Sequence, residues 1–337
     1  MMIELKNDRL VFNFPEVHPT ATADISFQRT LRIPDDGNTY PLPAGLGEFP
    51  LSHIEDHAAK VPADMLKRGG VLMPMYQSEA LWLNFSDDGY PMAIKVAAGK
   101  INAVTGKPWS DALAEQPQDY VVLPEQLWLD GYNVGEDLIR QFVAMPLGEG
   151  YTAEEQITGE AEFGGLQLIV YPMKAEVYYK LFETRSVIDD DMEFLDIPAF
   201  LRRPSETCES MGLAAGGLMR QEIYEDEYGM DVWDTESASR CFIHLCNSVD
   251  YAAITGRKPP HAPYTSKDYA QNGIPWFDYY GGEAKPLPGS AILGGLKSLA
   301  QIAKDKGEVI WGNETTNVGK VKVIKGEKTN SVSEGPF

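Results

Sequence analysis

The chain has 337 residues, of which 43% are hydrophobic and 23% charged, a composition typical of a globular protein with a sizeable core. Its 50 acidic residues outnumber the 29 basic ones, so the formal net charge is −21. Such a surface repels phosphate backbones and anionic lipid headgroups. We therefore expect no nucleic-acid partner and no membrane partner, and a ligand that is a protein or a small molecule.

The cysteine content and the N-terminal segment indicate a cytoplasmic protein. An odd, sparse set of cysteines (Cys208, Cys241 and Cys246) argues against a disulfide scaffold and fits a reducing compartment. The first residues, "MMIELKNDRLVFNF", carry charges early and have no apolar run of signal-peptide length. No apolar run in the chain approaches the roughly 18–20 residues of a membrane helix.

The first third of the chain is predicted to form short strands. In "RLVFNF", Leu10, Phe12 and Phe14 alternate with residues of the opposite face. The segments "DISFQRTLRI", "GGVLMPMY", "EALWLNF" and "PMAIKVAAG" follow as further strands, separated by Gly, Pro or turn residues. Polar residues interrupt these runs, which favours a mainly antiparallel sheet.

The middle of the chain alternates strands with short helices. "IRQFVAMP" is predicted to be a strand ending at Pro146, and Thr152 with Glu155 forms a capping box for a short helix. The strand "LQLIVYPM" and the amphipathic helix "AEVYYKLFE" come next. "DDDMEF" then supplies acidic residues where the N-terminus of a helix favours them.

In the last third, "RCFIHLCN" is predicted to be a strand and residues 289–307 an amphipathic helix that Gly307 ends. Gly106 and Gly256, each soon followed by proline, have the pattern of glycines at helix C-termini. "KVKVI" is expected to be an edge strand, and the last ten residues are expected to be mobile.

These elements predict an α+β, β-rich fold with a mainly antiparallel sheet and peripheral helices. We divide the chain into a β-rich domain at 1–180, a mixed α/β region at 181–312 packed on it, and a polar, partly mobile tail at 313–337.

The segment "SHIEDH" spaces His53 and His57 as a helical metal-binding pair would. The zincin signature needs Glu directly after the first His, and in the inverted signature Asp56 would replace the glutamate. Ser52 and Glu55 also form a capping box. We expect a capped helix start here and no metal site, because no spacing nominates a third ligand.

Other catalytic motifs fail on spacing. Cys246 and His244 share a strand face, but side chains two apart rarely make the hydrogen bond of a nucleophile–base pair. "AGKINAVTGKP" has Pro108 where a phosphate loop needs Ser or Thr. The chain contains neither G-x-G-x-x-G opening a helix after a strand nor G-x-S-x-G. The sequence nominates no cofactor.

Two segments combine aromatic and acidic residues, "MGLAAGGLMRQEIYEDEYGMDVWD" (211–234) and "NGIPWFDYYGG" (272–282). Such side chains can stack on a sugar, hold a cation or receive a basic peptide, although they can equally anchor loops to a sheet. The glycines allow a close approach of backbone. The candidate ligand-binding residues are Arg220, Gln221, Tyr224, Asp226, Tyr228, Trp233, Trp276 and Tyr279.

The same segments, with "RQFVAMPLGEGYTAEEQITGE", resemble an uncharacterised bacterial protein family. The resemblance implies a bacterial, cytoplasmic protein and assigns no catalytic residue.

Two functions remain open. The first is a non-catalytic binding or assembly protein that presents this aromatic–acidic surface to a partner. The alternative is a hydrolase-type enzyme that uses carboxylates, with or without a divalent cation. Its candidate acids are Glu225, Asp226, Asp231 and Asp234, with Arg220 orienting an anionic group. The enzyme requires these groups to converge in a pocket, whereas a binding surface spreads them out.

Overall fold

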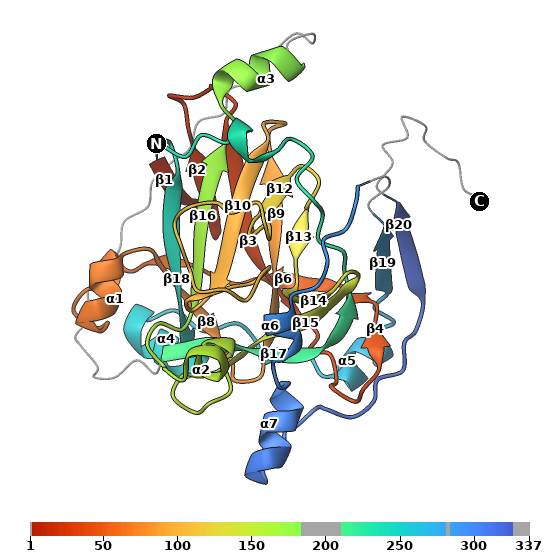
Figure 1. The fold of residues 1–337 in the computed structure, drawn as a ribbon. Helices are drawn as coiled ribbons and strands as arrows, with labels where there is room; N and C mark the ends of the chain where they lie inside the picture. Colours follow the sequence, from red (N-terminus) through yellow and green to blue (C-terminus); the bar gives the residue numbers. More distant parts are fainter. Residues whose placement is uncertain (1, 183–209, 281–283, 326–337) are drawn as a thin grey trace, which may run out of the picture.

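The computed structural model describes residues 2–182, 210–280 and 284–325, and strands dominate it (Figure 1). Most strands belong to one 17-stranded sheet. Helices lie around it, with α3 above the sheet and α7 below it in the view of Figure 1. The predicted α+β, β-rich fold with a mainly antiparallel sheet is confirmed.

The large sheet begins as a meander of neighbouring strands and continues through long-range pairs. Its longer strands are β1 (Met2–Lys6), β2 (Arg9–Asn13), β3 (Thr22–Thr30), β8 (Val71–Met75), β9 (Ala80–Asp87), β10 (Met92–Ala98), β14 (Gly131–Gly135), β15 (Leu138–Pro146), β16 (Leu166–Pro172), β17 (Ser210–Arg220) and β18 (Ser239–Asn247). Its short strands are β4 (Thr39–Tyr40), β6 (Gly45–Glu48), β7 (Ser52–His53), β11 (Ile101–Asn102), β12 (Val121–Leu123) and β13 (Trp128–Leu129).

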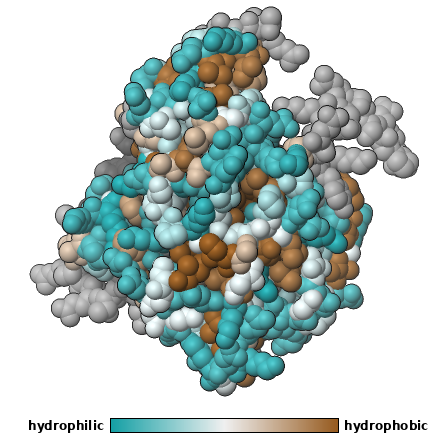
Figure 2. All heavy atoms as spheres, in the orientation of Figure 1, coloured by the Kyte–Doolittle hydropathy of each residue, from teal (hydrophilic) through white to brown (hydrophobic). Residues whose placement is uncertain are grey.

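Three further strands, β5 (Leu42–Pro43), β19 (Trp276–Tyr280) and β20 (Val321–Lys325), form a small separate sheet. The predicted strand "KVKVI" is β20, and it lies at the edge of this sheet as expected. Val323 and Ile324 of β20 are exposed, and Figure 2 shows apolar atoms at this side of the molecule. Figure 2 also shows apolar atoms gathered near the middle of the face, amid a largely polar surface.

Strand pairs cross the predicted domain boundary near residue 180. β16 pairs with β18, and β15 pairs with β17 over most of its length. One large cluster of buried side chains draws on both halves of the chain, with Phe12, Phe27, Tyr132 and Ile243 among its members. The described parts of 1–180 and 181–312 therefore share one sheet and one core.

The glycine-rich part of 211–234 forms β17, a strand that the sequence did not predict. Its glycines do allow a close backbone approach. A Cβ added at Gly217 would lie 2.4 Å from the carbonyl oxygen of Pro34, and one at Gly216 would lie 2.7 Å from the Val143 side chain. Glycine therefore brings β17 near the Ile33–Pro34 backbone, where a larger side chain would collide.

The helices are short. They are α1 (Ala63–Arg68), α2 (Ala153–Thr158), α3 (Ala175–Phe182), α4 (Ser248–Thr255), α5 (Ser266–Gln271), α6 (Ala291–Gly294) and α7 (Leu299–Lys306). The capping box of Thr152 and Glu155 is present at α2, and Gly256 ends α4 in a left-handed conformation. In the described parts of the chain, no helix is long and apolar enough to cross a membrane.

The single helix predicted at 289–307 is wrong. The structure divides it into α6 and α7, because Gly295 ends the first helix and Ser298 starts the second with a capping box. Glycines favour termination over continuation, and a serine hydroxyl satisfies the free amides of a new first turn. Gly307 does end α7, with φ of 73°.

The helix start predicted at "SHIEDH" is also wrong. Ser52 and His53 form β7, and only a short 3₁₀ turn follows at Glu55–His57 without a side-chain cap. Ser52 Oγ lies 2.9 Å from the hydroxyl of Tyr251, so it is used in the core and not as a cap. Pairing with β8 has outweighed the local capping pattern.

Gly106 is a turn glycine and not the end of a helix, because β11 and a turn precede it. The predicted helix start "DDDMEF", Cys208 and the last ten residues lie outside the described residues.

Candidate functional site

The aromatic residues singled out in the sequence are mostly structural. Trp233 and Trp276 are each 1% exposed, and Tyr224 is 3% exposed. Asp226 accepts hydrogen bonds from the Tyr120 hydroxyl at 2.7 Å and from Trp233 Nε1 at 2.8 Å. These groups therefore hold the loop after β17 against the core, and they are not free to stack on a ligand.

Three of the four acids of the hydrolase alternative, Glu225, Asp226 and Asp234, are bound to separate partners. Glu225 pairs with Lys285 at 2.6 Å. The Asp234 carboxylate accepts hydrogen bonds from the backbone amides of Glu236 and Ser237. Arg220 pairs with Asp278 at 2.9 Å. Within the described ranges, no group of three or more His, Cys, Asp or Glu side chains is placed to hold a metal ion. The geometry at these residues lends the hydrolase alternative no support.

Gln221 differs from the other candidate residues because it binds Asp130, a buried acid. It follows directly after β17, and only 7% of it is exposed. Its Nε2 donates to Asp130 Oδ2 at 2.9 Å, and its Oε1 accepts from the Asp130 amide at 3.0 Å. Gln221 thus holds both the side chain and the backbone of Asp130.

Asp130 lies between β13 and β14, and 2% of it is exposed. Burial raises the pKa of its carboxyl to about 8, and the hydrogen bond from Gln221 counters this effect in part. A carboxyl group with this pKa is mostly protonated at neutral pH.

A pocket of about 190 Å³ opens beside Asp130. Aromatic side chains dominate its walls, with Trp82 from β9, Trp128 from β13 and Phe277 from β19; Ile324 of β20 lies at the same pocket. Tyr279 packs edge-on against Trp128, with ring centroids 4.7 Å apart. The pocket therefore lies where the small sheet meets the large one.

The strand register explains this grouping. β13 pairs antiparallel with β9, with Trp128 opposite Asn84 and Leu129 opposite Leu83. Extending the register by one residue places Asp130 opposite Trp82, and directly opposite residues of a pair share a face. Trp128 shares this face because side chains two apart in a strand point the same way.

Trp82 also has an unused donor. Its Nε1 is buried and has no hydrogen-bond partner among the described residues. Gly45 lies against the same ring, since an added Cβ would be 3.2 Å from Trp82 Cζ2. A buried N–H without an acceptor is costly, so this ring is held at some cost to stability.

A smaller hollow adjoins the pocket through Leu42 and Trp128, and it is lined by two more acids, Glu125 and Glu222. Burial raises the pKa of Glu125, and the Tyr228 hydroxyl donates to Glu125 at 3.3 Å. These acids and Asp130 line two neighbouring hollows, and no Lys or Arg is among the lining residues of either. In their ionised form these carboxylates favour a positively charged ligand.

The sequence found this site only in part. Gln221 and Tyr279 were candidates, but Asp130, Trp82, Trp128 and Phe277 were not. The lining residues come from segments far apart in the chain, and the pattern of "LWLD" (127–130) is typical of an ordinary strand end. Only the pairing of β9 with β13 brings Asp130 and Trp82 together.

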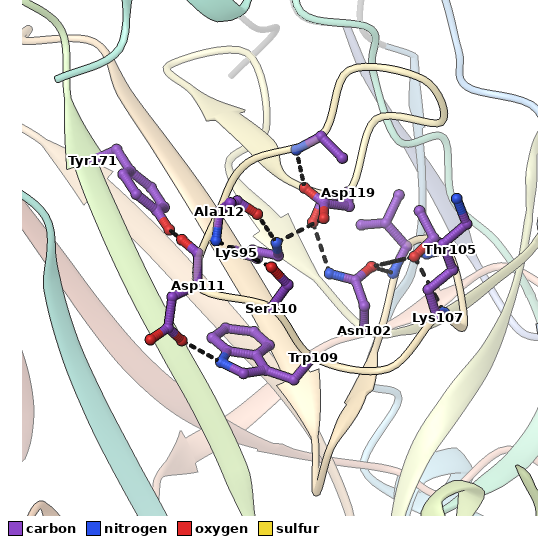
Figure 3. A network of polar contacts seen from close by, with 12 residues as sticks. Lys95, Asn102, Thr105, Lys107, Trp109, Ser110, Asp111, Ala112, Asp119 and Tyr171 are labelled. Carbon is purple, nitrogen blue, oxygen red and sulfur yellow. Dashed lines mark hydrogen bonds and ion pairs between the residues drawn. The ribbon is translucent and has the colours of Figure 1, made fainter. Parts of the chain in front are cut away.

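A second buried polar network has a structural role (Figure 3). Lys95 is 1% exposed and pairs with Asp119 at 2.6 Å, while Asn102 Nδ2 donates to the Asp119 carbonyl at 2.7 Å. Asn102 Oδ1 accepts from the amides of Val104 and Thr105. These groups satisfy one another and fix the loop between β11 and β12.

Comparisons with known proteins add no assignment: no family model, no curated protein and no solved structure matches the chain.

Proposed function

We propose that the protein is a non-catalytic binding protein and that the pocket beside Asp130 receives a small organic ammonium ion. One observation carries the proposal: a buried carboxyl group lies in a pocket walled by Trp82, Trp128 and Phe277. Aromatic faces attract cations, and the attraction is strongest when the cation is desolvated. The carboxylate supplies the matching charge.

The chemistry of the ligand follows from the size and polarity of the site. A pocket of about 190 Å³ suits an alkylammonium ion of a few carbon atoms. A chain of net charge −21 also attracts cations from solution. The buried free thiol of Cys241 supports a cytoplasmic location.

Binding must be linked to proton release. The cation needs Asp130 ionised, whereas burial raises the pKa of this carboxyl to about 8. Affinity for the cation should therefore rise by up to about tenfold per pH unit below pH 8 and level off above it.

Calorimetric titration with tetramethylammonium and with choline at pH 6, 7 and 8 tests the proposal. 3,3-Dimethyl-1-butanol, a neutral analogue of choline, should bind at least about tenfold more weakly than choline. Asp130→Asn should abolish the preference for the cation. Asp24→Asn is the matched control, because burial raises the pKa of that carboxyl too but it does not line the pocket. Equal binding of choline by wild type and Asp130→Asn would contradict the proposal.

A further inference from the structure

A second cavity, of about 440 Å³, lies where four segments of the chain meet. They are the end of β3, the turn before β9, residues 263–266 and residues 309–312. None of the aromatic residues of the Asp130 pocket lines this cavity. It is therefore a separate site, and its chemistry differs.

A buried ion pair fixes the base of this cavity. Arg29 and Glu79 are 4% and 2% exposed. Arg29 Nε donates to Glu79 Oε1 at 2.7 Å, and the Tyr76 amide donates to Glu79 Oε2 at 2.9 Å. Arg29 also donates to the carbonyl oxygen of His261 at 2.7 Å. The charge of Glu79 is thus neutralised inside the protein, so this carboxylate is not available to a cationic ligand.

Arg32 supplies the positive charge at this cavity. It is the only Lys or Arg among the residues that line the cavity. Burial lowers its pKa to about 10, which Glu314 counters in part, so the group stays charged at neutral pH. Its hydrogen bond in the described structure goes to the carbonyl oxygen of Trp311. A guanidinium has five N–H donors, and the Trp311 carbonyl accepts from one of them.

A hydroxyl group adds to the site. Ser78, Thr265 and Ser266 line the same cavity as Arg32. The Ser78 hydroxyl donates to Met145 Sδ at 3.6 Å, and the Thr265 hydroxyl donates to Asp268 Oδ2 at 2.6 Å. The Ser266 hydroxyl is therefore the one that the cavity offers to a ligand.

The indole of Trp311 lies at the same cavity and is 86% exposed. Tryptophan is rarely so exposed, and a flat apolar ring at the rim of a cavity can stack on a planar ligand. The backbone of Trp311 is held by Arg32, which ties the stacking surface to the charge.

We propose that this cavity binds a small molecule that joins an oxyanion, a carboxylate or a phosphate, to a flat apolar body. The oxyanion pairs with Arg32 and accepts a hydrogen bond from the Ser266 hydroxyl. The flat body rests on the Trp311 indole. An arginine fork matches two oxyanion oxygens at once, which selects these groups over neutral amides.

Calorimetric titration of the unmodified protein with three probes tests the proposal. Benzoate and phenyl phosphate present the two oxyanions on the same ring, and benzamide replaces the charge with a neutral group of similar shape. At least one anion should bind about tenfold or more tightly than benzamide. The tighter of the two identifies the oxyanion. Equal binding of all three probes, or no binding of either anion, would overturn the proposal.

Two variants locate the binding. Arg32→Gln should weaken the preferred anion about tenfold or more and leave benzamide unchanged, and Arg32→Lys should restore part of the affinity. Arg240→Gln is the matched control, because Arg240 pairs with Asp111 and does not line the cavity. Unchanged anion binding by a folded Arg32→Gln protein would overturn the assignment. Choline binding in these variants reports separately on the Asp130 pocket.

Discussion

The side-chain amide of Gln221 makes two hydrogen bonds with Asp130. Its nitrogen donates to the Asp130 carboxyl at 2.9 Å, and its oxygen accepts from the Asp130 backbone amide at 3.0 Å. The residue after β17 is thereby tied to the junction of β13 and β14. This link keeps a carboxyl group buried beside a pocket, where a protein would otherwise place an apolar side chain.

Asp130→Asn should change how stability depends on pH. The pKa of Asp130 is raised from 3.8 to about 8 by folding, so the folded state holds a proton that the unfolded state releases. Wild-type stability should therefore lose about 1.4 kcal/mol per pH unit from this group between about pH 4 and pH 8. Urea unfolding at pH 5, 6, 7 and 8 measures the free energy of unfolding of both proteins. The difference should shift in favour of the variant by about 1.4 kcal/mol for each pH unit. Parallel curves would refute the assignment.

Gln221→Leu should lower the free energy of unfolding by about 1–3 kcal/mol, because it leaves the Asp130 amide and carboxyl without their partner in a buried site. Chemical denaturation at pH 6, where Asp130 is neutral in the wild type, measures the loss. Gln271→Leu serves as the control, since Gln271 is exposed at the end of α5. Equal stability of the two variants would show that the hydrogen bonds between Gln221 and Asp130 contribute little to the free energy of unfolding.

Gly217→Ala should destabilise the fold through a collision of backbone and side chain. The new methyl group would lie 2.4 Å from the Pro34 carbonyl oxygen, and overpacking of this kind costs about 1–3 kcal/mol. Gly319→Ala is the control, because no atom lies within 4 Å of its added Cβ. Thermal unfolding of both variants measures the difference. An unchanged midpoint for Gly217→Ala would show that β17 can move away from Ile33–Pro34 at little cost.

What the sequence predicted well is local. The alternation in "RLVFNF" predicted β2, and the apolar run "LQLIVYPM" predicted β16. The capping pattern of Thr152 and Glu155 predicted α2. Each of these depends on residues within one turn or one strand. The prediction failed where distant pairing competes with local chemistry, as at Ser52, whose hydroxyl contacts Tyr251 instead of capping a helix.

The candidate site followed the same rule. Gln221 was found because it stands in an unusual aromatic–acidic segment. Asp130 was missed because its importance comes from burial and from Trp82 across the β9–β13 pair, neither of which leaves a local pattern. Trp276 looked equally promising in the sequence, yet its side chain packs into the core against Tyr40 and Tyr269.

Glu79→Gln should be among the most damaging single changes outside the hydrophobic core. It removes the charge that neutralises Arg29, a residue with only 4% of its surface exposed, and an unpaired buried charge costs about 3–5 kcal/mol. Glu48→Gln is the matched control, since it breaks the more exposed pair with Arg9, where the expected loss is below about 1 kcal/mol. Urea unfolding at pH 7 compares the two losses. If Glu79→Gln cost no more than Glu48→Gln, water or a shifted side chain would have to satisfy Arg29, and the buried pair would not be what fixes the base of the Arg32 cavity.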